Sequence, residues 1–257
     1  MAEKLSAVII TFNEERNIER CLSSLDGWVD EIVVVDSFST DRTKEICEQF
    51  NVRFIENAFE GHIEQKNFAM NQASNDYVIS LDADEAVSKE LKAQIEVEKE
   101  NFTFDSYTFN RLTNYCGQWI KHCGWYPDKK LRIWNKSKGQ WGGENPHDMV
   151  IMQSGTTNKH LKGDLLHYSY YTVNDHTKQI EFFSDIGARA AFEAGKRTSV
   201  LGILFKPSFK FFRDYFLKLG FLDGYYGFVI SVNSAHAKFL KYHKLRELQK
   251  ANKSKSS

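Results

Sequence analysis

The chain has 257 residues, of which 42% are hydrophobic and 26% are charged, and its formal net charge is zero. This composition excludes a dominantly disordered protein and is typical of a folded chain with one large core, with or without an appendage. The neutral balance also argues against a dedicated nucleic-acid binder.

The sequence predicts neither an export signal nor a membrane-spanning helix. Its amino terminus enters a strand-like run at once, and no run approaches the roughly 18 to 20 apolar residues that a spanning helix needs. We therefore expect a cytoplasmic protein. The four cysteines fit neither a zinc spacing nor a short disulfide framework, so reduced thiols are expected.

Strands and helices alternate in the first third of the chain. Four apolar runs rich in β-branched residues predict buried strands, at residues 5–11, 31–36, 52–56 and in a run that ends at Asp82. Between them, helical spacing predicts helices that carry Ile18 to Leu25, Ile46 to Phe50 and residues 62–73. Asn13 is the expected cap of the first helix. This alternation predicts a parallel sheet with right-handed crossovers, whose ligands lie beyond the carboxyl ends of the strands.

Polar residues collect where three of these strands end. They are the segments Thr11–Glu14, Asp36–Asp41 and Asp82–Asp84. One such end could simply cap a helix, but three that converge on one edge indicate a nucleotide site. The acceptor-only carboxylate of Asp36 suits ribose hydroxyls or a base edge. These turns contain neither a P-loop nor a Gly-x-Gly-x-x-Gly pattern, which argues against a P-loop nucleotidase and a dinucleotide dehydrogenase.

Asp82 and Asp84 form the most informative pair in the sequence. Alternation along an extended strand would place both side chains on one side, where they can reach a single ligand. Two carboxylates there are costly to desolvate unless a cation or a hydrogen-bonding ligand is bound, and a hard divalent ion on a phosphate is the simplest partner. The alternative is a turn in which one aspartate caps the following helix.

Four segments, in their order and spacing, resemble the family 2 glycosyltransferases, which are inverting enzymes with the GT-A fold. They are residues 8–15, 32–41, 65–67 and 81–85, within a similarity that spans roughly residues 4–150. The closest resemblance is to the branch that extends the core of lipopolysaccharide or lipooligosaccharide, and residues 167–170 and 220–228 also look like that branch.

The resemblance implies an α/β fold, in which a Rossmann-like, mostly parallel GT-A sheet is flanked by helices and followed by a helical extension. The catalytic domain would span residues 1–170, with a nucleotide-sugar half at 1–100 and an acceptor half at 101–170. The helical extension would span residues 171–257.

The resemblance also implies roles for individual residues. The donor, a nucleoside diphosphate sugar and first of all a UDP-sugar, would be bound by Thr11, Asn13, Glu14, Asp36, Ser39, Lys66 and Asp82. Asp84 would bind Mg²⁺ or Mn²⁺ on the diphosphate, with His147 as a further metal or phosphate ligand. The ion would neutralise charge that develops on the departing diphosphate.

Inversion requires a carboxylate that takes the proton from the acceptor hydroxyl. The expected base is Asp148, where the family more often has the longer glutamate, and Glu144 is the reserve. One or both of Trp125 and Trp141 are expected to line the acceptor site, because aromatic faces suit sugar rings, although tryptophans are more often simply packed. Arg132 either meets acceptor phosphates there or is plain surface charge.

From about residue 173 the spacing of apolar residues predicts helices. Residues 206–257 hold eleven basic against three acidic residues, and aromatic residues are interleaved with the first basic ones. This combination suits the headgroup zone of an anionic membrane. We therefore expect peripheral attachment to the inner face of the cytoplasmic membrane, a lipid-linked saccharide acceptor such as the lipopolysaccharide core, and no nucleic-acid partner. The alternative is that these aromatic residues pack on the catalytic domain.

Two other interpretations stay open on the sequence alone. A phosphatase of the haloacid dehalogenase type would use Asp82 as nucleophile and Asp84 as acid and base, although that motif normally opens its domain. A membrane-associated scaffold with a degenerate glycosyltransferase site is the second, and the intact Asp36 and Asp148 argue against it.

Overall fold

The structure, a computed structural model, describes residues 3–144 and 147–255 and divides the chain into two compact units. Unit 1 comprises residues 1–112 and 128–168, and unit 2 comprises residues 113–127 and 169–257. Each unit is described by itself.

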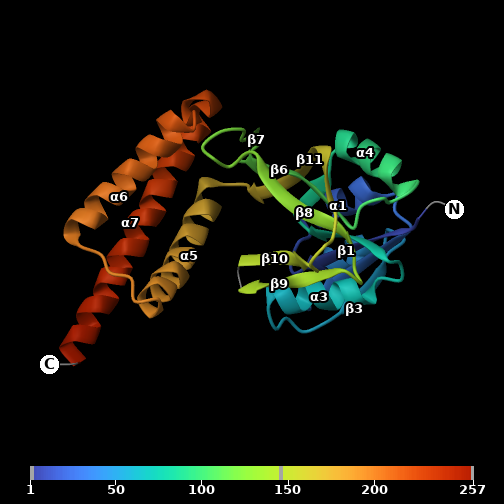
Figure 1. Cartoon of the computed structure of the whole chain (residues 1–257), viewed down its shortest axis with the longest axis horizontal. Coiled ribbons are helices and arrows are strands. Elements are labelled where there is room, and N and C mark those ends of the chain that lie inside the picture. Colours follow the sequence, from blue (N-terminus) through green and yellow to red (C-terminus); the bar gives the residue numbers. More distant parts are fainter. Residues whose placement is uncertain (1–2, 145–146, 256–257) are drawn as a thin grey trace. The chain divides into compact units, whose positions relative to one another are not determined.

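Unit 1 is built on a mixed sheet (Figure 1). In spatial order its strands are β3 (Arg53–Glu56), β2 (Glu31–Asp36), β1 (Leu5–Thr11), β4 (Tyr77–Asp82), β8 (Asp128–Asn135), β6 (Ser106–Tyr115), β11 (Asn158–Tyr170) and β5 (Glu85–Val87). The first four are parallel, as the alternation predicts, whereas β8 runs antiparallel to both β4 and β6. A separate antiparallel hairpin is formed by β9 (Gly139–Glu144) and β10 (His147–Met152).

Alternate side chains of the parallel strands enter two different cores. In β1, Leu5, Ala7 and Ile9 face a cluster that includes the apolar sides of α1 (Ile18–Leu25), α2 (Thr43–Cys47) and α4 (Lys89–Lys99). Val8 faces the opposite cluster, which α3 (His62–Gln72) and the β9 residue Trp141 complete. Figure 1 shows α4 and α3 on opposite faces of the sheet. Both faces are therefore covered, which is why these strands read as nearly continuous apolar runs.

The prediction that Asn13 caps the first helix is wrong. Asn13 has a φ of 53°, which is left-handed backbone, and α1 begins only at Ile18 after the cap residue Asn17. The second predicted helix is also shorter than expected: α2 ends at Cys47 and does not reach Phe50. Asn13 instead forms hydrogen bonds to the loop after β2, as described below.

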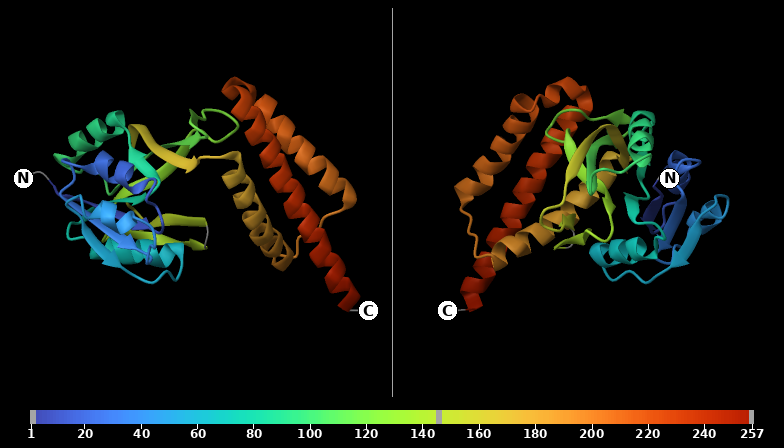
Figure 2. Two further views of the ribbon diagram at one scale, coloured as in Figure 1. Left: turned by 180° about the vertical axis from the view of Figure 1, so that it is seen from behind. Right: turned by 45° about the vertical axis from the view of Figure 1, so that its right-hand side comes forward.

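Unit 2 is mainly helical, which confirms the predicted helical extension. It contains α5 (Val173–Glu193), α6 (Val200–Phe212) and α7 (Gly224–Lys255), together with the strand β7 (Gln118–Trp119), the π-helical turn η1 (Arg213–Leu217) and the 3-10 turn η2 (Gly220–Asp223). α7 packs against both α5 and α6 and lies between them in both views of Figure 2.

Two local features fix the ends of these helices. Thr172 and Asp175 form a capping box at the start of α5. At the start of α7, a Cβ on Gly227 would lie 1.8 Å from the carbonyl oxygen of Gly220, so only glycine permits this close approach to η2. The four cysteines are free thiols, as expected.

Candidate active site

The register of the parallel strands brings three polar strand ends together in unit 1. Thr11, the last residue of β1, pairs with Asp36, the last residue of β2. On the other side of β1, Ile10 pairs with Asp82, the last residue of β4. The carboxyl ends of β2, β1 and β4 therefore lie side by side, at the edge where open α/β sheets bind ligands.

The loops after β1 and β2 are joined by hydrogen bonds. The Asn13 N–H donates to Ser39 Oγ at 2.7 Å, and Asn13 Oδ1 accepts from the Thr40 N–H at 2.8 Å. The Glu14 N–H donates to Thr43 Oγ1 at 2.8 Å. These bonds hold the two loops as one wall, in which the left-handed Asn13 serves as a bridge and not as a helix cap.

Asp36 and Thr11 lie at the base of this wall and are both buried. The Asp36 carboxylate accepts from the N–H and the Oγ of Ser39, at 2.7 and 2.5 Å. Thr11 Oγ1 is buried with no hydrogen-bond partner among the residues that the structure describes. A buried hydroxyl without a partner calls for an explanation, and a bound ligand that supplies the missing bond is one.

Lys66 joins two carboxylates that are far apart in the sequence. Its Nζ lies 2.7 Å from Asp148 Oδ2 and 3.0 Å from Asp82 Oδ1, and the residue is only 4% exposed. α3 places Lys66 under the strand end, and β10 places Asp148 opposite it. A buried ammonium group is tolerated only when it is paired, and here two carboxylates pair it.

Arg132 is a second buried cation beside Asp82. Its Nη2 lies 3.1 Å from Asp82 Oδ2 and 2.7 Å from Glu85 Oε1. Burial alone would raise the pKa of Asp82, but Lys66 and Arg132 hold it well below its usual range. Glu85, which is 1% exposed, also accepts from the N–H of Asp82 at 3.0 Å, so it fixes the turn that carries the aspartate pair.

Asp84 has a different partner from Asp82. The chain leaves the extended conformation at Ala83 and Asp84, so the alternation that would place both aspartates on one side does not apply. Asp84 Oδ2 lies 3.1 Å from His167 Nε2. Burial alone would lower the pKa of His167, but the carboxylate of Asp84 raises it above its usual value.

His167 is a site residue to which the sequence reasoning assigned no role. The antiparallel pairing of β11 with β5 sets His167 opposite Glu85, next to Asp84. Its only signal in the sequence is its place in the segment 167–170, which resembles a branch of the family. Nothing local in the sequence indicates that this histidine returns to the aspartate pair.

The residues around Asp84 fit a divalent ion that is held largely by its substrate. Burial, together with the nearby charges of Asp84, Asp41 and Asp82, raises the pKa of Glu14 to about 7 despite a hydrogen bond from Asn17. A cation would relieve this crowding of carboxylates. Within the described residues, no group of three or more aspartate, glutamate, histidine and cysteine side chains is arranged for a metal. Asp84 would supply a carboxylate oxygen to such an ion and His167, once deprotonated, an imidazole nitrogen, while water and diphosphate oxygens would complete the ligand set.

A cavity of about 550 Å³ opens beside the Lys66 pair. Its lining includes Lys66, Asp82, Arg132, Trp141 and Asp148. The Trp141 ring stands under two cations, with Lys66 Nζ 4.4 Å and the Arg132 guanidinium 5.4 Å from its centre. Trp141 Nε1 and Arg132 Nε are buried without a partner in the part of the chain that the structure describes. The cavity wall thus combines buried donors, positive charge and one candidate base.

The remaining predicted residues are placed as follows. Trp125 belongs to unit 2, where its ring contacts Tyr115, Tyr170 and His176, so its assignment to the acceptor stays a prediction. Glu144 and His147 end β9 and begin β10 and pair with each other in register, but their side chains lie outside the described residues. Their assignments as reserve base and metal ligand also stay predictions.

Comparison with known proteins gave matches along most of the chain. The sequence profile described as Glycosyl transferase family 2 matches residues 6–194. An uncharacterized glycosyltransferase of Rickettsia felis is 32% identical over 95% of this chain and 90% of its own length. The lipopolysaccharide core biosynthesis glycosyltransferase LpsC of Rhizobium meliloti is 28% identical over 94% of this chain and 91% of its own. Among solved structures, S. aureus TarS 1–349 aligns with a TM-score of 0.47 at 16% identity, over 97% of this chain and 92% of that one.

Proposed function

Because the chain belongs to glycosyl transferase family 2, we propose that it transfers one sugar from a nucleoside diphosphate donor to a saccharide acceptor, with inversion and with the help of a divalent ion. The observation that carries this proposal is the Lys66 bridge. It joins Asp82, at the donor edge of the sheet, to Asp148, in the wall of the cavity, through contacts of 3.0 and 2.7 Å.

The donor occupies the edge formed by the loops after β1 and β2. Asp36, oriented by Ser39, accepts from the base or the ribose, and Thr11 Oγ1 gains the partner that it lacks. Asn13 and Glu14 form the wall beside the nucleotide. A UDP-sugar is the donor that we would test first.

Asp148 takes the proton from the acceptor hydroxyl as that oxygen attacks the anomeric carbon from the face opposite the leaving diphosphate. Lys66 fixes the carboxylate through Oδ2 and holds it at the donor edge. A divalent ion bound beside Asp84 and His167 would neutralise the charge that develops on the departing diphosphate. Arg132 keeps Asp82 ionised and oriented throughout.

The acceptor is a lipid-linked glycan of the lipopolysaccharide core type. One supporting observation is the similarity to a relative named for lipopolysaccharide core biosynthesis, over nearly the whole of both chains. A second is the lining of the cavity, where Arg111, Lys129, Lys130 and Arg132 suit the acidic groups of such a glycan. An enzyme that acts on such an acceptor would bind at the surface of an anionic membrane.

The experiment that tests this proposal separates donor binding from transfer. A thermal-shift screen with uridine, guanosine and thymidine diphosphates should show stabilisation by one of them, whereas a degenerate scaffold would respond to none. Asp148→Asn should then lower transfer by about 100-fold or more, because general base catalysis contributes at least that much, while the shift is retained. Asp26→Asn, on the exposed end of α1, is the matched control. Undiminished turnover in Asp148→Asn would remove Asp148 as the base.

A further inference from the structure

Most of the exposed large apolar side chains of the described residues lie in one segment of unit 2, between Val200 and Val232. Monomeric proteins rarely expose a contiguous apolar patch of this kind unless it binds something. α6 contributes six such residues, and the five that share one face we call the α6 stripe: Leu201, Leu204, Phe205, Phe209 and Phe212.

The α6 stripe occupies one face of its helix. Its members are spaced three, one, four and three residues apart, which keeps them on a single side of an α-helix. Phe205 is 68% exposed and Phe209 is 60% exposed, whereas Ile203, on another face, is buried. α6 thus turns its most apolar face away from the core, the reverse of an ordinary helix in a globular protein.

The charges around the stripe are of one sign. Between Ser199 and Val232 the sequence has only two acidic residues, Asp214 and Asp223, and both are buried. Asp214 is neutralised by ion pairs with Lys210 and Arg213, and Asp223 accepts from the backbone and ring of His122. The exposed charges in this segment, on Lys206 and Lys218, are therefore positive.

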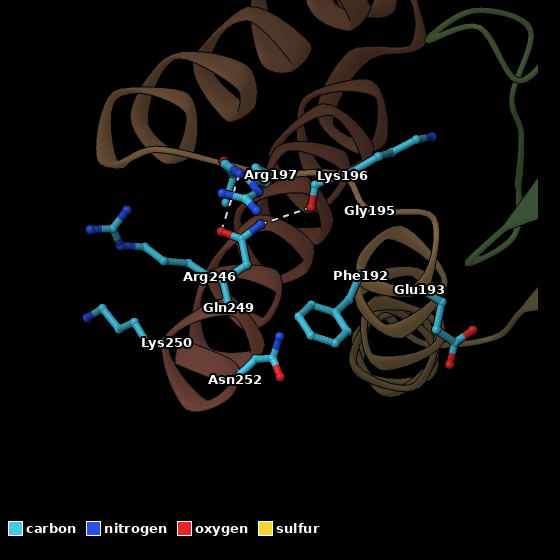
Figure 3. A pocket seen from close by; sticks show the side chains of 10 residues that line it. Phe192, Glu193, Gly195, Lys196, Arg197, Arg246, Gln249, Lys250 and Asn252 are labelled. Atoms are coloured by element: carbon cyan, nitrogen blue, oxygen red, sulfur yellow. Dashed lines mark hydrogen bonds between the residues drawn. The ribbon is translucent and has the colours of Figure 1, made fainter. Parts of the chain in front are cut away.

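A basic pocket adjoins the start of α6. A cavity of about 540 Å³ lies between the end of α5, the segment before α6 and the last turns of α7. Four basic residues line it together with the single acidic Glu193: Lys196, Arg197, Arg246 and Lys250. Figure 3 shows Lys196 and Arg197 on the connecting segment and Arg246 and Lys250 extending together from α7, whereas the Lys196 side chain points the other way.

Gln249 gives this pocket a defined wall. Its Nε2 donates to the carbonyl oxygen of Lys196 at 2.9 Å, and its Oε1 accepts from the Thr198 N–H at 3.5 Å. The basic segment is thereby tied to α7 two residues before α6 begins at Val200. An anionic headgroup bound there would be adjacent to the chain that enters the apolar stripe.

We propose that unit 2 binds an anionic lipid bilayer, with the α6 stripe in the boundary between headgroups and acyl chains and the basic pocket on a lipid phosphate. None of the described helices has the length and hydropathy to cross a bilayer, so the stripe lies in the interface. A second copy of the chain is a poorer occupant, because a symmetric contact would bring like positive charges together. This inference deepens the proposed function, since it supplies the surface that would meet a lipid-linked acceptor.

The test is cosedimentation of the full chain with vesicles of phosphatidylethanolamine and phosphatidylglycerol. Exchanging Phe205 and Phe209 together for serine should weaken binding by roughly tenfold or more, because two rings no longer enter the acyl boundary. Phe182→Ser, an equally exposed phenylalanine on α5, is the matched control and should bind like the unaltered chain. Arg197→Ala should weaken binding to phosphatidylglycerol vesicles and leave the weaker binding to phosphatidylcholine vesicles unchanged.

Three outcomes would overturn the inference. One is full vesicle binding by the double serine variant, and another is an equal loss in Phe182→Ser. The third is a dimer in solution that ignores vesicles and that the double variant dissociates. Failure here is distinguishable from failure of the proposed chemistry, because the double variant should still transfer sugar to a soluble acceptor fragment, and Asp148→Asn should still bind vesicles.

Discussion

At the scale of the residue, the site depends on two buried cations between carboxylates. Lys66 and Arg132 both contact Asp82, and each has a second carboxylate, Asp148 or Glu85, on its other side. Such groups cost a large desolvation free energy, which their pairing offsets. Their main contribution is to position the site, because each cation orients two carboxylates at once.

Removal of Lys66 should therefore cost stability as well as activity. We expect Lys66→Met to lower the free energy of unfolding at pH 7 by about 3 kcal/mol, because it leaves Asp148 without its buried partner. Urea denaturation measures this, with Lys89→Met, at an exposed position of α4, as the control. A loss no larger than that of the control would contradict the bridging role.

A second residue-scale prediction concerns the metal. Asp84→Ala should abolish transfer, and His167→Ala should raise the Mn²⁺ concentration for half-maximal transfer by roughly tenfold or more, because each removes a side chain that we propose to bind the ion. Transfer is measured across a Mn²⁺ titration, and His243→Ala, half exposed on α7, is the control. Full activity of the unaltered chain in a chelator would be fatal to the metal assignment.

At the scale of the element, α5 is anchored by a buried histidine. His176 Nδ1 lies 3.0 Å from the Tyr115 hydroxyl and 3.2 Å from Asn233 Nδ2, among the rings of Trp125 and Tyr170. Because the NH₂ group of Asn233 can only donate, Nδ1 accepts from it and the imidazole is neutral. Burial lowers the pKa of His176 to about 4.

This depressed pKa makes unit 2 sensitive to acid. In the unfolded chain His176 takes up a proton near pH 6.5, whereas folded unit 2 keeps it neutral until the pH approaches 4. The contribution of this neutral burial to the free energy of unfolding of unit 2 is therefore fully present above pH 6.5 and decreases as the pH falls toward 4. The loss should approach about 3 kcal/mol, at roughly 1.4 kcal/mol for each pH unit. Unfolding followed by tryptophan fluorescence at pH 7 and 4.5 measures it. His176→Gln should lose most of the difference, and an unchanged pH dependence would contradict the assignment.

At the scale of the whole molecule, the fold was more predictable than the site. The strands β1 to β4 were predicted from local patterns, because strands buried on both faces are continuously apolar. The family match confirms the resemblance read from four short segments and excludes the phosphatase alternative. The glycosyltransferase class thus follows from the first third of the chain.

The missed features depend on long-range pairing. Lys66 meets Asp148 across 82 residues, and His167 reaches Asp84 only because β11 returns to pair with β5. Asp82 and Asp84 do not alternate along one strand, because the extended conformation ends at the turn that begins with Ala83. Glu85 stabilises this turn by accepting a hydrogen bond from the N–H of Asp82. Sequence patterns report local preference, whereas these contacts depend on the separate β9–β10 hairpin and on the return of β11 to the main sheet.

We propose that this chain adds one sugar to a lipid-linked glycan with Asp148 as the base. This proposal is tested most directly by mass spectrometry of lipid-linked glycans from cells that lack the gene, after incubation with the purified protein, Mn²⁺ and a panel of nucleotide sugars. We expect a mass increase of one sugar residue with one donor, and none with the Asp148→Asn variant. No increase with any donor, or an equal increase with the variant, would contradict it.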